Sequence, residues 1–150
     1  MKNKSVIVLI LLMLGLNIFN HASSDEFNFN ISELQITENG NVIKGVNGGV
    51  ATTKNNEIII TADNFKYNKL TTLLEAEGNV ELVDKIEDII IKSNKIFYLK
   101  KKEKIYTEGK SEAFSGTDFQ IDADQYFKYD KLTSILEAKG EVKLDDKIKN

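Results

Sequence analysis

The segment Tyr67–Lys85 reads YNKLTTLLEAEGNVELVDK, and Tyr129–Lys147, 62 residues later, reads YDKLTSILEAKGEVKLDDK. Half of this offset predicts an intermediate copy, which is present because Tyr98 and Gly109 lie midway between the matching tyrosines and glycines. A divergent copy begins at Phe27. A fixed period of this length is typical of repeat architectures. The sequence therefore predicts four tandem units of about 31 residues, at 27–57, 58–88, 89–119 and 120–150.

Each unit reads as strand, turn and strand. Leu74, Ala76, Val80 and Leu82 alternate with polar residues, which is the period-2 pattern of a strand with one buried and one solvated face. The first strand of a unit changes parity partway, at 63–64 and 94–95, where a β-bulge or bend would keep its apolar side chains on one face. We therefore expect an all-β fold of tandem strand-turn-strand repeats.

The composition restricts the classes of function. The chain has 150 residues, 41% hydrophobic and 29% charged, which is typical of one globular domain. Cysteine is absent, which excludes disulfides and thiolate metal sites. All 20 basic residues are lysines and the net charge is -3, so the guanidinium that reads guanine edges is missing. These features argue against nucleic acid as a partner.

The N-terminus has the plan of a secretory signal. Lys2 and Lys4 precede an apolar run over 6–16, and small and polar residues follow up to Ser24. We predict a signal peptide at 1–24, cleaved to leave a domain at 25–150; an uncleaved anchor remains the alternative. Cleavage would remove His21, the single histidine. We therefore predict a non-enzymatic protein with no catalytic residue, no metal site and no cofactor.

Two recurring polar features have structural interpretations. Gly78, Gly109 and Gly140 interrupt strands, where glycine costs stability unless a bend or close packing requires it. Asp63 and Asp124 recur at the predicted bend, where a local Asx turn is a better interpretation than acid-base catalysis. Neither feature predicts chemistry.

The inward apolar stripe can be plain core or an apolar trough that holds acyl chains, in which each buried methylene contributes about 0.8 kcal/mol. The candidates for such a lipid groove are the apolar residues at inward positions of the units: Ile58, Ile60, Phe65, Tyr67, Leu74, Val80, Ile91, Ile96, Tyr98, Ile105, Ile121, Phe127, Tyr129, Leu136 and Val142.

The recurring Ile-x-Ala-Asp, Phe-x-Tyr and Leu-x-Ala-x-Gly-x-Val-x-Leu pattern over 27–150 resembles the OstA-type β-jellyroll family of lipopolysaccharide transport, which includes LptA-like proteins and the N-terminal domain of LptD-like proteins. The resemblance implies a partly open antiparallel β-jellyroll. It implies a periplasmic protein, associated with the outer membrane, that carries lipopolysaccharide in an apolar groove. Implied partners are lipopolysaccharide, other OstA-type jellyrolls paired through edge strands, and the outer membrane assembly machinery.

Two other classes of function remain alternatives. One is a structural exported β-repeat protein that self-assembles by its edge strands and has a dry inner face. The other is a carboxylate hydrolase, which needs two carboxylates about 5 to 10 Å apart in one cleft, whereas the acidic residues here alternate outward. The sequence also leaves open whether the chain is a free-standing bridge or the first domain of a longer barrel protein.

Overall fold

The computed structural model describes residues 26–116 and 118–146, so the predicted signal segment lies outside the described residues. The described part consists of strands joined by short turns, two of which are 3-10 segments. The elements in chain order are β1 (Phe27–Thr37), η1 (Glu38–Gly40), β2 (Val42–Thr53), β3 (Ile58–Ala62), β4 (Asn64–Asn68), β5 (Leu73–Asp84), β6 (Ile89–Leu99), η2 (Lys100–Lys102), β7 (Lys104–Ser115), β8 (Phe119–Ala123), β9 (Tyr126–Asp130), β10 (Ile135–Lys139) and β11 (Lys143–Asp146).

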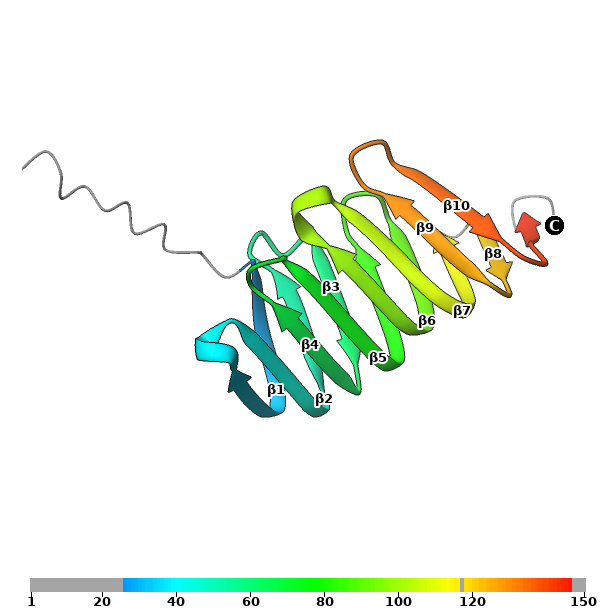
Figure 1. Ribbon diagram of the computed structural model, residues 1–150. Helices are drawn as coiled ribbons and strands as arrows, with labels where there is room; N and C mark the ends of the chain where they lie inside the picture. Colours follow the sequence, from blue (N-terminus) through cyan, green and yellow to red (C-terminus); the bar gives the residue numbers. More distant parts are fainter. Residues whose placement is uncertain (1–25, 117, 147–150) are drawn as a thin grey trace, which may run out of the picture.

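All strand pairs are antiparallel and follow chain order. β1 and β2 begin the stack, and β10 and β11 end it, as Figure 1 shows from its blue to its red end. No helix within 26–116 or 118–146 is long and apolar enough to cross a membrane. The predicted all-β class and the partly open antiparallel β-jellyroll are therefore confirmed.

The long strands bend at a shared corner. β6 changes register between Ser93 and Lys95, and the break between β3 and β4 falls at Asp63. These are the places where the parity change in the sequence predicts bends. On the paired strand β5, the register shift spans Gly78 and Asn79, both with positive φ. Glycine adopts this conformation at little cost, so the corner explains the glycine inside the strand.

The corner divides the stack into two half-sheets. The first half-sheet contains β3, β8, β11 and residues 27–31, 49–53, 80–84, 89–93 and 111–115 of the long strands. The second half-sheet contains β4, β9, β10 and residues 33–37, 42–46, 73–77, 95–99 and 104–108. One buried apolar cluster draws side chains from both half-sheets, so the core lies between them.

Backbone hydrogen bonds at the turns repeat with the period of the sequence. An amide N–H in each later turn of the second half-sheet donates to a carbonyl of the preceding turn, and both partners advance by 31 residues at each step: Lys69 to Asn41 (2.9 Å), Lys100 to Thr72 (3.1 Å) and Lys131 to Glu103 (2.9 Å). Because buried or strand-end amides need partners, this ladder ties each turn to the one before it.

The two half-sheets cross with an offset. Phe27 of the first strand packs its ring against Tyr67 (centroids 5.2 Å apart) and Tyr98 (5.7 Å) of the second half-sheet. Asp84 on β5 of the first half-sheet meets Tyr129 on β9. In each contact, the strand in the second half-sheet lies further along the stack than its partner in the first. At one end the second-half-sheet part of β1, and at the other end β11 of the first half-sheet, therefore lack a covering strand, and Ile36 and Leu144 are exposed there.

Candidate functional site

The inner faces carry continuous rows of side chains, because residues paired directly across antiparallel strands point to the same face. In the first half-sheet one row runs Phe29, Ala51, Ile60, Leu82, Ile91, Ala113, Ile121 and Leu144. In the second half-sheet the matching row runs Ile36, Ile43, Tyr67, Leu74, Tyr98, Ile105, Tyr129 and Leu136.

The candidate groove residues lie along this inner surface, and most of them are buried. Twelve of the fifteen are at most 4% exposed: Ile58, Ile60, Phe65, Tyr67, Leu74, Val80, Ile91, Ile96, Tyr98, Ile105, Phe127 and Tyr129. Ile121 and Leu136 are partly buried against the same cluster. Val142 is 47% exposed and lies just before β11. The middle of the inner surface is therefore packed, and its C-terminal end is open.

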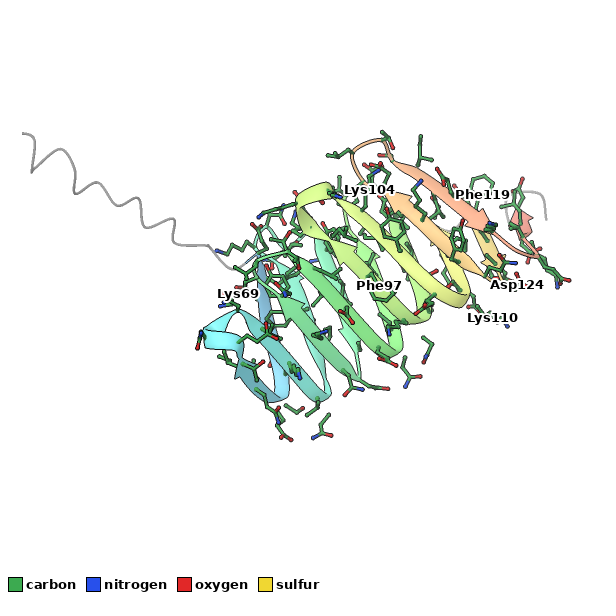
Figure 2. The ribbon with its side chains drawn as sticks, viewed as in Figure 1. Lys69, Phe97, Lys104, Lys110, Phe119 and Asp124 are labelled. Atoms are coloured by element: carbon green, nitrogen blue, oxygen red, sulfur yellow. The ribbon has the colours of Figure 1, made fainter. Side chains whose placement is uncertain are left out.

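Apolar inner surface is exposed at both ends of the stack, as the offset of the half-sheets requires. At the N-terminal end, Leu34 and Ile36 of β1 project from the second half-sheet, and Ile36 is 60% exposed. At the C-terminal end, Phe119 and Leu144 belong to the first half-sheet, Val142 lies just before β11, and Leu144 is 61% exposed. We call Leu34 and Ile36 the N-terminal overhang, and Phe119, Val142 and Leu144 the C-terminal overhang. Figure 2 places Phe119 at the C-terminal end.

A buried carboxylate connects the half-sheets in the middle of the stack. Asp84 is fully buried, and one of its oxygens accepts a hydrogen bond from the Tyr129 hydroxyl at 3.0 Å. The Lys131 ammonium forms an ion pair with the same oxygen. The other oxygen accepts backbone N–H bonds from Ile86 (3.0 Å) and Glu87 (3.3 Å). Four donors therefore satisfy the buried charge.

These contacts shift the pKa values of the cluster. Burial by itself raises the pKa of Asp84, but the Lys131 bond and charge, with the Glu87 N–H and the Tyr129 hydroxyl, outweigh burial and hold the pKa below its ordinary value. Burial, followed by the Asp84 charge and hydrogen bond, raises the pKa of Tyr129. At neutral pH Asp84 is therefore a carboxylate and Tyr129 a phenol.

The equivalent tyrosine of the preceding unit, Tyr98, also contacts a carboxylate. The Tyr98 hydroxyl donates to Glu103, which also pairs with Lys100. Burial first, and then the Glu103 hydrogen bond, raise the pKa of Tyr98. All these side chains belong to the second half-sheet or its turns. This cluster therefore stabilises the second half-sheet and does not connect it to the first.

A cavity of about 370 Å³ lies where the turns of the two half-sheets face each other. Turns of the first half-sheet contribute Asn55, Glu57, Ile86 and Glu87, and turns of the second contribute Lys100, Glu103, Lys131 and Leu132. We call the opening between these turns the mouth. Lys131 lines the cavity and also reaches Asp84, so the mouth lies directly beside the buried cluster.

The recurring aspartates act at the corner, but in a way that differs from the predicted Asx turn. Asp63 accepts a hydrogen bond from the Asn79 side chain at 2.8 Å, and Asp124 accepts one from the Glu141 backbone at 2.8 Å. The first bond joins the β3–β4 corner to Asn79 at the corner of β5, and the second joins the β8–β9 corner to Glu141 between β10 and β11. Each aspartate thus fastens two neighbouring corners.

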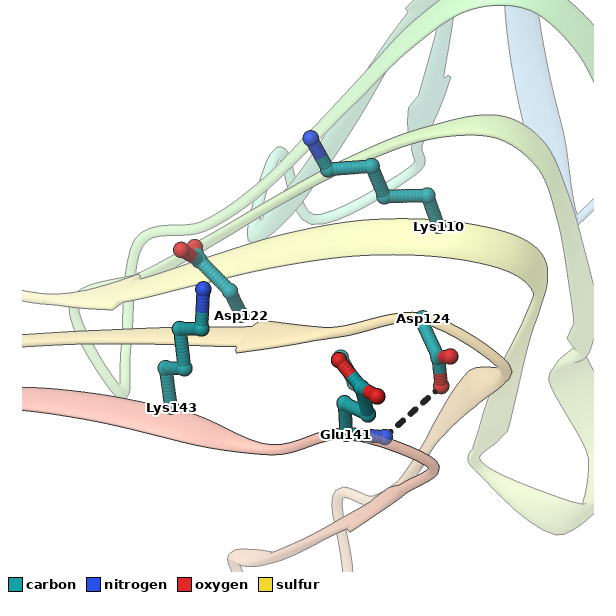
Figure 3. Close-up of a pocket in the computed structure, with 6 residues that line it drawn as sticks. Lys110, Asp122, Asp124, Glu141 and Lys143 are labelled. Carbon is teal, nitrogen blue, oxygen red and sulfur yellow. Dashed lines mark hydrogen bonds between the residues drawn. The ribbon is translucent and has the colours of Figure 1, made fainter.

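A smaller cavity of about 190 Å³ lies at the last corner, lined by Asp122, Asp124 and Glu141 together with Lys110 and Lys143 (Figure 3). Figure 3 marks the Asp124–Glu141 bond, which commits that carboxylate to the backbone. Within the described ranges, no group of three or more His, Cys, Asp or Glu residues could hold a metal ion.

Sequence reasoning missed Asp84, and of the overhang residues it named only Val142 as a groove candidate. Asp84 continues the inward parity of Val80 and Leu82, so a carboxylate at an apolar position was a visible signal. Leu34, Phe119 and Leu144 have inward parity as well. Their exposure follows from how the half-sheets cross, for which a strand pattern contains no signal.

Comparison with solved structures identifies the fold. The chain is similar to the crystal structure of LptH, the LptA homologous periplasmic component of the conserved lipopolysaccharide transport device from Pseudomonas aeruginosa. The TM-score is 0.68 at 11% sequence identity, and the match covers 81% of this chain and 97% of LptH. In sequence comparisons, no family model and no curated protein matches. The LptA-like, OstA-type fold indicated by the repeat motif is confirmed.

Proposed function

From an LptA-like fold with apolar surface running through it, we propose that this chain is a periplasmic lipopolysaccharide-binding domain that forms part of a transport bridge toward the outer membrane. The observation that carries the proposal is the continuity of the inner rows. Ile121 and Leu144 extend the buried row of Ile60 and Ile91 into solvent at the C-terminal end. A surface that is buried in the middle and exposed at its ends is suited to pass apolar chains between molecules.

The fifteen inward residues would contact the acyl chains. Each methylene that moves from water onto this surface contributes about 0.8 kcal/mol. Since the middle positions are buried against one another, acyl chains would bind there only as the half-sheets separate. The overhangs need no such change, so lipid can contact Phe119, Val142 and Leu144 while the half-sheets stay closed.

The overhangs also support end-to-end joining with other OstA-type jellyrolls. The N-terminal overhang belongs to the second half-sheet and the C-terminal overhang to the first. If β1 of one molecule followed β10 and β11 of another, the crossing of the half-sheets would continue and the two overhangs would cover each other. Edge strands supply unpaired backbone groups for such addition. The proposal also includes export by the predicted signal peptide and the outer membrane assembly machinery as a partner.

Photo-crosslinking tests the lipid contact. p-Benzoylphenylalanine replaces Phe119, on the inner face, and in a matched variant it replaces Phe97, which packs beneath Lys95 on the outer face (Figure 2). After irradiation in the cell envelope, the adduct is probed for lipopolysaccharide. We expect an adduct from position 119 and none from 97. A further variant carries p-benzoylphenylalanine at position 144. If the variants at 119 and 144 are both folded and neither gives a lipid adduct, the proposal is overturned.

The packing of the middle positions favours a second candidate, an exported structural β-repeat protein that assembles by its edges. Sedimentation of purified protein with and without lipopolysaccharide distinguishes the two candidate functions. Filaments that form without lipid, together with absence of lipid adducts, would favour the structural protein.

A further inference from the structure

The mouth is closed by polar groups although the interior behind it is apolar. Two lips face each other across the mouth. The first consists of turns 54–57 and 85–88, and the second of 100–103 and 131–134. Behind them lie Ile58, Tyr98 and Ile105, all at most 1% exposed. The mouth therefore lies between solvent and the buried core, at a place apart from the two ends of the stack.

Asp84 has the connections that a latch between the lips needs. The N–H groups of Ile86 and Glu87 hold one carboxylate oxygen on its own lip. The other oxygen is left for the opposite lip, where Tyr129 and Lys131 bind it from 45 and 47 residues away. Acceptor and donors thus sit on different half-sheets. Separating the half-sheets would break these bonds while leaving the rest of each half-sheet paired.

The entrance beside the latch carries apolar side chains. Ile86 is 65% exposed and Leu132 is 75% exposed, and they line the mouth cavity from opposite lips. Neither has an inward position in a strand, so their exposure is not an effect of the open ends. An alkyl chain arriving at the mouth would meet these two residues first.

Resting on the proposed function, we propose that acyl chains enter the interior laterally through the mouth cavity and that Asp84, Tyr129 and Lys131 form the latch that closes it. Ile86 and Leu132 receive the chain, and separation of the lips admits it to the inner rows. Once the chain has entered, the latch closes again over the occupied core.

The test locks the mouth. The chain contains no cysteine, so Asn55→Cys with Leu132→Cys can be joined across the lips by a short bismaleimide whose disulfide is cleavable. Lys101→Cys with Leu132→Cys joins two turns of the same lip and is the matched control. Uptake of cis-parinaric acid is followed by fluorescence, and purified lipopolysaccharide competes. Each linked protein is compared with the same double-cysteine variant before linking: we expect the cross-lip link to slow uptake at least tenfold and its cleavage to restore the rate, whereas the link within one lip should leave the rate of its own unlinked variant unchanged.

Latch variants give an independent measurement on the unlinked protein. Tyr129→Phe and Lys131→Met each remove one hydrogen bond to the buried carboxylate, which should speed uptake about tenfold. Circular dichroism and thermal melting establish that each variant is folded. The proposal is overturned if unlinked protein takes up the probe and neither the cross-lip link nor either folded variant changes the rate; lipid binding through the ends would then stand. If no form binds the probe or lipopolysaccharide, the proposed function fails as well.

Discussion

The hydroxyl of Tyr129 lies 3.0 Å from a carboxylate oxygen of Asp84, although 45 residues separate them in the chain. This bond joins β9 in the second half-sheet to β5 in the first, across the apolar core. A charge in such a place persists only when donors surround it. Here two of the donors belong to the opposite half-sheet, so the stability of the charge and the closure of the fold depend on each other.

Asp84→Ala should destabilise the protein strongly. The substitution leaves the Tyr129 hydroxyl without an acceptor and the Lys131 ammonium, whose side chain is 11% exposed, without its counter-charge. Breaking a buried pair by removing one partner costs about 3 kcal/mol. Urea unfolding measures the change. Asp145→Ala is the control, because Asp145 is exposed on the last strand and its loss should change the unfolding free energy by less than about 0.5 kcal/mol. Equal effects of the two variants would contradict the role of Asp84.

The Asp84 charge also predicts a pH dependence. Its pKa in the folded protein lies below the ordinary 3.8, so folding is favoured by the ionised form. This contribution is complete above the unfolded pKa and is lost as pH falls through the folded pKa. The difference in unfolding free energy between wild type and Asp84→Asn should therefore be constant from pH 7 to about pH 5 and shrink at lower pH.

Urea titrations at several pH values check this, with Asp145→Asn as the control for the general effect of losing one carboxylate. If the difference between wild type and Asp84→Asn stays constant down to pH 2.5, folding does not lower the pKa of Asp84, and the contacts with Tyr129 and Lys131 do not favour its ionised form.

The repeat and the face of each strand could be predicted from the sequence, because period and parity are local. Ile60, Ile91 and Ile121 recur at one parity, and all three lie on the inner face. The corner of the first unit was harder to recognise. It lies at Asn47 and Gly48, both with positive φ, so its glycine comes second, whereas Gly78 comes first in the next unit. A search for glycine at a fixed spacing misses this exchange.

The open ends could not be predicted in the same way. Leu144 has the same parity as Leu82 in the second unit, yet it is 61% exposed while Leu82 is fully buried. The difference depends on which strands of one half-sheet lie over which strands of the other, and this follows from the crossing of the half-sheets. The sequence pattern of a single strand contains no information on which strands of the other half-sheet cover it.

Gly78 and Gly109 should differ in their tolerance of alanine. Both have positive φ, +82° and +79°, so an L side chain at either costs about 1 kcal/mol. A Cβ at Gly78 would also lie 2.4 Å from Oδ2 of Asp63, whereas a Cβ at Gly109 would meet nothing within 4 Å. We expect Gly78→Ala to cost about 1–2 kcal/mol more than Gly109→Ala in urea unfolding.

A double-mutant cycle isolates the contact. Asp63→Ala should relieve part of the cost of Gly78→Ala, and it should be additive with Gly109→Ala, because residue 109 does not touch Asp63. Additivity in both cycles would show that the corner absorbs the extra carbon without the aspartate.

The Thr107 hydroxyl replaces a backbone acceptor at the last corner, and Thr107→Val tests this. The fourth unit has one extra residue there, and pairing of β7 with β9 stops at Tyr106 and Lys128. The next amide, Phe127 N–H, donates instead to Oγ1 of Thr107 at 2.7 Å, and the Ser111 hydroxyl also lies 2.7 Å from this oxygen. Valine keeps the shape of threonine but leaves a buried N–H without an acceptor, which costs about 1–3 kcal/mol.

Thr107→Ser is the matched control, because serine keeps the oxygen and loses only a methyl group. We expect the valine variant to be the less stable of the two in urea unfolding, and its Phe127 amide to exchange with deuterium faster than in the serine variant. Because exchange reports the opening of a single amide, the second measurement separates a lost hydrogen bond from a general change in packing. Equal exchange at Phe127 in both variants would mean that another acceptor serves this amide, and the extra residue of the fourth unit would then need a different compensation.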